Sequence, residues 1–401
     1  MDTKKQKKIK VLRIIARLNI GGPAIHAILL TGGIDKNRFE TVLVSGVTSK
    51  GEGDMFYLAK EKNVNPVIIQ ELGRNLNIRN DIIAFFKIYK LLNKEKPDII
   101  HTHTAKAGAL GRLAGIFYRF FSWNKCILIH TFHGHIFHSY FDNLSTKLFL
   151  WTERFLARFT DTIITISKQQ YYEIKNVFKV SSKDNIEVIP LGFDLEPYLN
   201  SLRKEGNFRK DLKVSDNEIL VGIVGRLVPI KNHRLLLEAA SQINGDLAGR
   251  IKFIIIGDGE LKATLVDYAK DLSMENRVIF AGWRKDLYEI YPDLDIVALT
   301  SLNEGTPISV IEAMACARPV IASDVGGVKD LIEDGVTGIL FRRNNSKELS
   351  SAIIRLAQDE ILRKKIGDTA RNKVREIYSA KRLVRDIENL YENLIREREE
   401  K

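Results

Sequence analysis

Cysteine and long apolar segments are both scarce in this 401-residue sequence. Its two cysteines, Cys126 and Cys316, lie far apart in apolar surroundings, so we expect buried, reduced thiols and neither a disulfide nor a metal site. No apolar run approaches the roughly 20 residues that span a membrane. The basic N-terminus precedes no apolar stretch typical of a signal peptide. These absences predict a cytoplasmic protein, either free or peripheral on the inner face of the cell membrane.

Acidic residues are outnumbered by basic ones, 50 against 62, which gives a formal net charge of +12. Such a charge attracts polyanions, namely nucleic acids, anionic membranes or diphosphate substrates. No recognisable nucleic-acid-binding module accompanies the charge, so we expect no nucleic-acid partner. The length predicts two or three domains.

Short apolar segments alternate with stretches of helical periodicity, a pattern typical of doubly wound parallel sheets in an α/β protein. A segment rich in proline and glycine near 190–198 interrupts the alternation, which then restarts. We therefore predict a domain of residues 1–195, a second of residues 196–378, and a C-terminal helix, 379–401, that packs back on the first. The expected strands are 11–16, 41–46, 66–69, 98–103, 127–132, 162–167, 186–190, 219–225, 253–257, 278–282 and 296–299.

The stretch from 299 to 330 combines a strand, a glycine-containing loop and a helix start. The helix should begin near Pro307, because proline is tolerated in the first turn. Two carboxylates, Glu304 in the loop and Glu312 on the helix, stand eight residues apart. Free amides and the helix dipole converge at such a place, which favours a site for anions and polar ligands.

Two further loops follow first strands. In the second half, Arg226 and Lys231 come after Gly225, where a diphosphate would lie against a forked guanidinium and a point charge. In the first half, Gly21 and Gly22 would allow main-chain amides to approach a phosphate, although a tight turn explains them equally well. The loop lacks the G-x-G-x-x-G spacing of dinucleotide-binding proteins, which argues against a nicotinamide cofactor.

Six of the eight histidines fall between residues 99 and 141. A zinc cluster is one interpretation, but no carboxylate or cysteine lies at ligand spacing, and we expect the His101 and His103 side chains to point in opposite directions. We therefore predict no metal. The alternative is a wall of hydrogen-bonding groups that faces a hydroxyl-rich, anionic ligand. Asp293 and Asp295 resemble a D-x-D metal motif, but Asp295 leads into a buried strand and is better explained as structural.

Residues 111–125 interleave aromatic side chains with arginine and lysine. One interpretation is a segment that enters an anionic membrane surface. The other is a core-packed helix whose aromatic side chains face the sheet and whose arginines are solvated. The basic charge slightly favours the membrane.

Taken in order, these motifs resemble those of retaining glycosyltransferases of family 4, with the GT-B fold of two Rossmann-like doubly wound domains facing across a cleft. The resemblance extends over nearly the whole chain, and its histidine-rich segments are similar to bacterial members that build surface polysaccharides such as lipopolysaccharide or capsule. The motifs are Gly21-Gly22, residues 97–103, residues 131–134, residues 189–194, Gly225-Arg226 with Lys231, Gly257-Asp258-Gly259, and Glu304 to Glu312 with Pro319.

The resemblance also implies roles for individual residues. Glu312 would bind the ribose hydroxyls of the donor nucleotide and Glu304 the donor sugar, while Arg226 and Lys231 would neutralise the diphosphate. His133 would lie beside the donor sugar. Further contacts to phosphate, nucleotide or acceptor would come from Gly21, Gly22, Gly257, Trp283 and the loop residues Gly305, Thr306, Pro307, Ile308 and Ser309.

The function so implied is a hexosyltransferase that retains anomeric configuration and needs neither cofactor nor metal. It would move a sugar from a nucleotide sugar, with a UDP-sugar as the expected donor, to a lipid-linked or oligosaccharide acceptor in cell-envelope polysaccharide synthesis. Two alternatives stay open: a sugar-nucleotide epimerase of the same fold, and a non-catalytic scaffold that binds nucleotide sugars.

Overall fold

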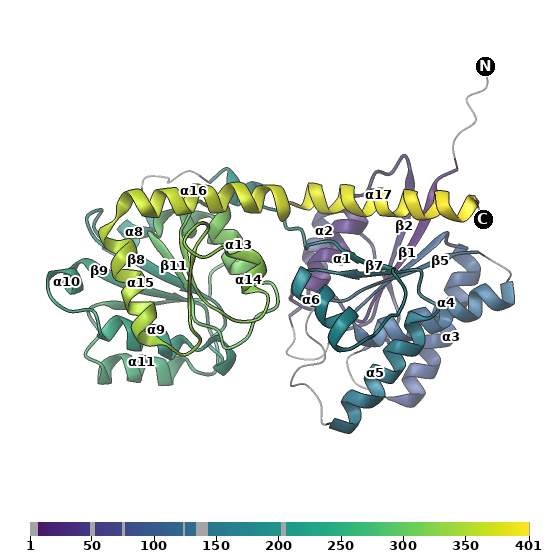
Figure 1. The fold of residues 1–401 in the computed structure, drawn as a ribbon, viewed down its shortest axis with the longest axis horizontal. Helices are drawn as coiled ribbons and strands as arrows, with labels where there is room; N and C mark the ends of the chain where they lie inside the picture. Colours follow the sequence, from purple (N-terminus) through teal and green to yellow (C-terminus); the bar gives the residue numbers. More distant parts are fainter. Residues whose placement is uncertain are drawn as a thin grey trace, which may run out of the picture. The chain divides into compact units, whose positions relative to one another are not determined.

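The computed structural model describes residues 7–48, 53–73, 77–122, 125–133, 143–201 and 206–400 (Figure 1). The chain forms two compact α/β units. Unit 1 comprises Met1–Phe193 and Ala380–Lys401, and unit 2 comprises Asp194–Ser379. The boundaries predicted at 195/196 and 378/379 lie within two residues of these. The expectation of two Rossmann-like parallel-sheet domains is confirmed.

Unit 1 contains a seven-stranded parallel sheet in the order β3-β2-β1-β4-β5-β6-β7. In the central register, Val11 of β1 lies between Thr41 of β2 and Ile99 of β4. Strands buried on both sides account for the near-continuous apolar segments in the sequence. The strands are β1 (Ile9–Ile15), β2 (Phe39–Ser45), β3 (Val67–Ile68), β4 (Ile99–His103), β5 (Ile127–Thr131), β6 (Thr162–Thr165) and β7 (Ile186–Val188).

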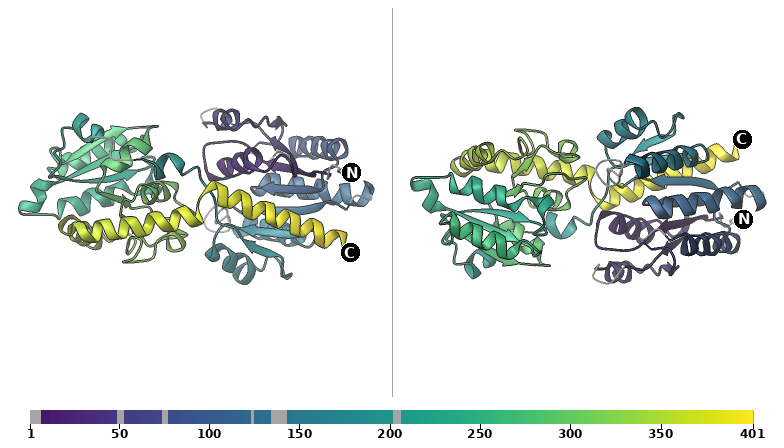
Figure 2. Two further views of the ribbon diagram at one scale, coloured as in Figure 1. Left: turned by 90° about the horizontal axis from the view of Figure 1, so that it is seen from above. Right: turned by 90° about the horizontal axis from the view of Figure 1, so that it is seen from below.

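Helices cover both faces of this sheet. Helices α1 (Gly22–Gly33) and α17 (Ala380–Glu399) pack on one face, where Leu383, Ile387 and Tyr391 of α17 join the core around Val11. Figure 2 shows α17 lying along unit 1. Helices α3 (Ile78–Glu95) and α4 (Ala105–Ser122) pack on the other face. The shorter elements are α2 (Phe56–Glu61), α5 (Asn143–Ala157), α6 (Lys168–Tyr172) and a π-turn at Glu173–Val177.

Unit 2 repeats this architecture with a six-stranded parallel sheet in the order β10-β9-β8-β11-β12-β13. The strands are β8 (Ile219–Val224), β9 (Ile251–Ile256), β10 (Val278–Gly282), β11 (Ile296–Leu299), β12 (Val320–Ser323) and β13 (Ile339–Phe341). The helices are α7 (Glu196–Leu199), α8 (Asn207–Asp211), α9 (His233–Ser241), α10 (Asp246–Arg250), α11 (Lys262–Asp271), α12 (Leu287–Ile290), α13 (Ile308–Ala315), α14 (Val328–Leu331), α15 (Ser346–Gln358) and α16 (Glu360–Ile377), with 3-10 turns at Pro229–Lys231 and Tyr291–Asp293.

Each sheet has a point where the strand order reverses. In unit 1 the chain moves outward from β1 through β2 and β3, then continues on the other side of β1 with β4. In unit 2 the same reversal separates β8 from β11. Loops at such a switch point diverge and leave a crevice at the carboxyl ends of the strands, where open α/β sheets bind ligands. The loops after β1, β4, β8 and β11 therefore lie where the two sheets would bind ligands.

The two acidic residues that resemble a metal motif are structural. Asp295 Oδ2 accepts a hydrogen bond from the Leu220 main-chain N–H at 2.8 Å and one from Arg209 at 3.0 Å. Asp293 Oδ2 accepts from the main-chain N–H groups of Phe208 and Arg209. The structural assignment of Asp295 is thus confirmed, as are the free, buried thiols of Cys126 and Cys316.

Helix α4 packs on the sheet, as one interpretation of residues 111–125 expected, but the arrangement of its side chains differs from that interpretation. Arg112 is fully buried and donates two hydrogen bonds to the carboxylate of Glu153, at 2.7 and 2.8 Å. Arg119 is held by Asp161 and by two main-chain carbonyls. In contrast, the aromatic side chains Phe117, Phe120 and Phe121 are exposed. The expectation of solvated arginines over a buried aromatic face was wrong, because Arg112 finds a carboxylate inside the protein. Trp123 lies outside the described residues.

Candidate active site

The switch point of unit 2 brings Lys231 and Glu304 into contact. Lys231 ends the 3-10 turn after β8, and Glu304 lies in the loop after β11. The Lys231 Nζ atom lies 2.6 Å from Glu304 Oε1, which also accepts a hydrogen bond from Ser301 Oγ at 2.6 Å. The Lys231 carbonyl in turn accepts from Thr300 Oγ1 at 2.9 Å. Lys231, which was predicted to neutralise the diphosphate, and Glu304, which was predicted to bind the donor sugar, therefore form an ion pair; we call it the Lys231–Glu304 centre.

Arg226 lies in the same loop as Lys231 and its side chain is exposed. Gly257, which follows β9, packs closely against the start of this loop. A Cβ atom at Gly257 would lie 1.9 Å from the Gly225 carbonyl oxygen. Gly257 thus has a packing reason to be glycine, and its predicted contact with the nucleotide stays a prediction. Trp283 follows β10, is exposed, and has the Lys285 ammonium 5.1 Å from its ring centroid.

Helix α13 begins directly after the Glu304 loop. It begins at Ile308, close to the predicted start, and Pro307 is its N-cap and not a residue of its first turn. The first-turn amides have no carbonyl partner within the helix, and the helix dipole adds partial positive charge there. These amides, with those of Gly305 and Thr306, could receive a phosphate or a sugar hydroxyl. Pro307 has no N–H, so its predicted contact with the ligand, which stays a prediction, could not be a hydrogen bond donated by its main chain.

Gly326 and Gly327 shape this loop, a role that the sequence did not reveal. The Gly327 N–H donates to the Glu304 carbonyl at 3.0 Å. A Cβ atom on Gly327 would lie 1.9 Å from the Gly305 carbonyl oxygen, and one on Gly326 would lie 2.1 Å from that of Glu304. Gly326 also adopts a left-handed conformation, with φ of +49°, which favours glycine. The adjacent pair Gly326-Gly327 is the sequence feature that could have indicated this role.

Glu312 accepts hydrogen bonds from two tyrosine hydroxyls. Tyr198 of α7 donates at 2.8 Å and Tyr291 at 3.2 Å. Burial raises the pKa of Glu312 to about 7, and the two hydroxyl donors oppose the rise. The carboxylate can thus accept hydroxyl hydrogen bonds, which is the chemistry that a ribose would require. Neither tyrosine was predicted, and only the folded chain brings Tyr198 to Glu312.

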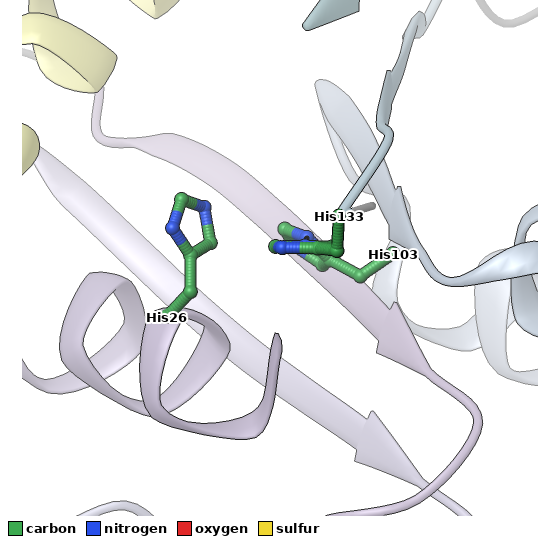
Figure 3. A group of neighbouring side chains, drawn as sticks. All are labelled: His26, His103 and His133. Carbon is green, nitrogen blue, oxygen red and sulfur yellow. Dashed lines mark hydrogen bonds between the residues drawn. The ribbon is translucent and has the colours of Figure 1, made fainter. Parts of the chain in front are cut away.

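In unit 1, three histidines converge at the switch point (Figure 3). His26 comes from α1, His103 ends β4, and His133 follows β5. One ring nitrogen of each lies within 4.8 Å of one from each of the others, and His103 Nδ1 is 3.0 Å from His133 Nε2. The residue pair Gly21 and Gly22 leads into α1, so it belongs to the same edge of the sheet. His135 and His138 lie outside the described residues.

The expectation that His101 and His103 point in opposite directions was wrong. Residues two apart on a strand share a face, and the two rings have centroids 4.2 Å apart. His101 is a fully bonded core residue, since its ring nitrogens lie 2.6 Å from the Tyr391 hydroxyl and 2.7 Å from Thr131 Oγ1. Burial lowers the pKa of His133 to about 3 and also lowers those of His26, His101 and His103. The four imidazole rings are therefore uncharged at neutral pH.

Comparison with known proteins agrees with this geometry. The family described as Glycosyltransferase Family 4 matches residues 20–197, and the family described as Glycosyl transferases group 1 matches residues 204–373. An Escherichia coli UDP-Gal:alpha-D-GlcNAc-diphosphoundecaprenol alpha-1,3-galactosyltransferase is 32% identical over 342 residues, which cover 84% of this chain and 85% of that protein. The chain belongs to glycosyltransferase family 4.

Solved structures place this glycosyltransferase among GT-B proteins. The crystal structure of Anabaena HepE in complex with UDP has a TM-score of 0.79 at 23% identity, with 96% of this chain and all of that chain covered. The complex of HepE with UDP-glucose gives a TM-score of 0.73 at 22% identity, with the same coverage. The predicted family and fold are confirmed.

Proposed function

We propose that this glycosyltransferase moves a hexose from a UDP-sugar to a lipid-linked or oligosaccharide acceptor, with retention of configuration and without a metal ion. The observation that carries the proposal is the Lys231–Glu304 centre beside the start of α13. It combines a cation for a leaving diphosphate with a carboxylate for sugar hydroxyls.

The chemistry requires positive charge where the diphosphate leaves. Breaking the glycosidic bond of the donor places new negative charge on the β-phosphate, and fixed cations and amides can stabilise that charge. Lys231, Arg226 and the first amides of α13 would supply this stabilisation. Glu312 would accept the ribose hydroxyls, Glu304 those of the sugar, and His133 would lie beside the donor sugar. No protein group on this list requires a divalent ion.

The acceptor proposal rests on the Escherichia coli relative, whose name gives UDP-Gal as donor and alpha-D-GlcNAc-diphosphoundecaprenol as acceptor. HepE, which was crystallised with UDP-glucose, supports the same nucleotide for this chain. A lipid-linked saccharide would place the reaction at the membrane in the synthesis of a surface polysaccharide.

A membrane surface is also the partner that fits the exposed aromatic groups of unit 1. Through the half-buried Phe85, ring contacts connect the exposed Phe86 of α3 with the exposed Phe117 and Phe121 of α4. A second row on α5 contains Leu148, Trp151 and Phe155, and it continues to Phe159. Exposed basic residues accompany the second row, namely Lys147, Arg154 and Arg158. Apolar side chains with cations are suited to an anionic membrane interface. No helix among the described residues is long and apolar enough to cross a bilayer.

The donor can be tested by thermal stabilisation with UDP-glucose, UDP-galactose, UDP-N-acetylglucosamine and GDP-mannose, in EDTA. We expect one UDP-sugar to raise the melting temperature, and Glu312→Ala to reduce that effect. The selected donor is then incubated with a short-chain prenyl diphosphate that carries N-acetylglucosamine. A disaccharide product supports the proposal, whereas a new epimer of the donor in the absence of acceptor would identify an epimerase instead.

Membrane contact can be tested by sedimentation with vesicles that contain phosphatidylglycerol. We expect Phe120→Ser with Trp151→Ser to lower vesicle binding. Ile361→Ser is the matched control, since Ile361 is an exposed apolar residue of unit 2. Equal binding by all variants would remove the aromatic rows from the proposal.

A further inference from the structure

The histidine group of unit 1 contains buried nitrogen atoms that the protein leaves without partners. Both ring nitrogens of His26, Nε2 of His103 and Nδ1 of His133 have no hydrogen-bond partner among the described residues. His26 and His103 are 1% and 0% exposed. Buried polar atoms are normally satisfied, and His101 next to them has both ring nitrogens bonded. His103 Nδ1 and His133 Nε2 contact each other, so these two nitrogens, together with those of His26, are the atoms that could share a ligand.

The arrangement of the three rings suits one ion. A tetrahedral zinc ion with Zn–N bonds of about 2.0–2.1 Å separates its nitrogen ligands by roughly 3.3 Å. His103 Nδ1 and His133 Nε2 are 3.0 Å apart, close to that value. One ring nitrogen of His26 lies within 4.8 Å of a nitrogen in each of the other two rings, so its ring must approach. The movement of His26 breaks no hydrogen bond to a described residue, because neither of its nitrogens has such a partner. The ion would replace the contact between His103 Nδ1 and His133 Nε2. Figure 3 shows His26 facing the other two rings from α1.

We propose that His26, His103 and His133 form a three-histidine site for a divalent transition metal of the zinc class, with a fourth position open to water or to a ligand. The site lies at the switch point between β1 and β4, so the topology of the sheet brings the ligands together. His133 is only partly buried, which leaves a way in.

The donor set selects the kind of ion. Imidazole nitrogen suits zinc, copper, nickel and cobalt, whereas magnesium and calcium require oxygen ligands, which this group does not offer. The guanidinium group of Arg13 opposes a cation, since it lies near enough to affect His26 and His103 electrostatically. Its donors are directed at Thr31 and Tyr391. We therefore expect reversible binding, weaker than that of a structural zinc site.

A metal ion bound at this site would also regulate sugar transfer. A bound ion uses the lone pair of His133, so the contact of this residue with the donor sugar would be lost and the loaded protein should be inactive. This consequence rests on the proposed function, whereas binding itself does not. The two can fail separately, because binding is read by spectroscopy and transfer by product formation.

The test is a titration of the untagged full chain, stripped with a chelator that is then removed, with Co²⁺ as the probe. We expect one Co²⁺ per chain, with the intense visible absorption of four- or five-coordinate cobalt, lost on addition of Zn²⁺ and unaffected by Mg²⁺. His26→Ala and His103→Ala should each weaken binding by more than about 100-fold, since even outer-shell changes can cost 10–100-fold.

His233→Ala is the matched control. It removes a histidine of unit 2 that is also buried and also has two unpartnered ring nitrogens among the described residues, but it has no part in this group. If His26→Ala does not fold by circular dichroism, His26→Asn replaces it, because asparagine keeps a polar side chain of smaller volume. Absence of Co²⁺ binding, or equal binding by wild type and the folded His26 and His103 variants, overturns the proposal.

Discussion

The Nζ atom of Lys231 lies 2.6 Å from Oε1 of Glu304, across the point where the strand order of unit 2 reverses. Without a ligand the two charges stabilise each other. A bound donor would offer Lys231 a diphosphate and Glu304 the hydroxyls of a sugar. The same contact would therefore hold the carboxylate and the ammonium in place for two parts of one substrate.

Replacement of Lys231 by alanine should lower turnover by about 10²-fold or more, because a cation that acts on developing charge is lost. Steady-state kinetics with the selected UDP-sugar would measure the effect. Lys270→Ala is the control, since Lys270 is exposed and forms an ion pair with Asp267 on the surface of α11. If the two variants have the same turnover, Lys231 has no role in leaving-group stabilisation.

The raised pKa of Glu312 predicts a pH-dependent stability difference. Its folded pKa of about 7 lies above the ordinary value of 4.5, so the folded state holds a proton that the unfolded state releases. The contribution of Glu312 to stability should therefore fall as pH rises from about 4.5 to 7, and it should stay constant above that. The Glu312→Gln variant lacks this pH dependence. Its free energy of unfolding should therefore rise by about 1–3 kcal/mol relative to that of wild type between pH 5 and 8.

Urea unfolding of both proteins at pH 5, 6, 7 and 8 measures this difference. A difference in unfolding free energy that does not change over this range would mean that the carboxyl group titrates at its ordinary pH in the folded state.

Gly327→Ala should displace the Glu304 loop. The added methyl group would lie 1.9 Å from the Gly305 carbonyl oxygen, and overpacking of this kind costs about 1–3 kcal/mol. We expect lower stability together with a larger loss of donor affinity, measured by thermal unfolding and by calorimetric titration with the UDP-sugar. Gly249→Ala is the control, because a Cβ atom there meets nothing within 4 Å. Unchanged donor affinity in Gly327→Ala would separate the glycine from the site.

Arg112→Met should destabilise the protein by about 3–5 kcal/mol, since it leaves the buried carboxylate of Glu153 without its cation. Lys262→Met breaks an exposed pair with Asp258 and should cost less than about 1 kcal/mol. Chemical unfolding of both variants gives the comparison. A cost for Arg112→Met as small as that of the control would mean that the buried pair contributes little.

Local sequence patterns were sufficient to predict β1 to β11, the start of α13 and the Glu304 loop, but they missed β12 and β13. Each depends on residues close in the sequence: the apolar segment of β11, the glycine of the loop and the proline at the N-cap. The alternation of strands and helices likewise predicted the parallel sheets, because such sheets need crossover connections.

Other features depend on partners far away in the sequence. Tyr198 reaches Glu312 across 114 residues, and the partner of Arg112 is 41 residues distant. His26 meets His103 only because β4 pairs with β1 in the folded sheet. Strand order is not encoded in any short motif, so these contacts, and the histidine group that they form, required the structure.

The most direct test of the central claim is the anomeric configuration of the product. The protein is incubated in EDTA with an α-linked, ¹³C-labelled UDP-hexose chosen by thermal stabilisation, together with the prenyl diphosphate acceptor, and the new linkage is examined by NMR. We predict an α-linked disaccharide formed at an undiminished rate in EDTA. A β-linked product, or transfer that needs an added divalent ion, would contradict the account.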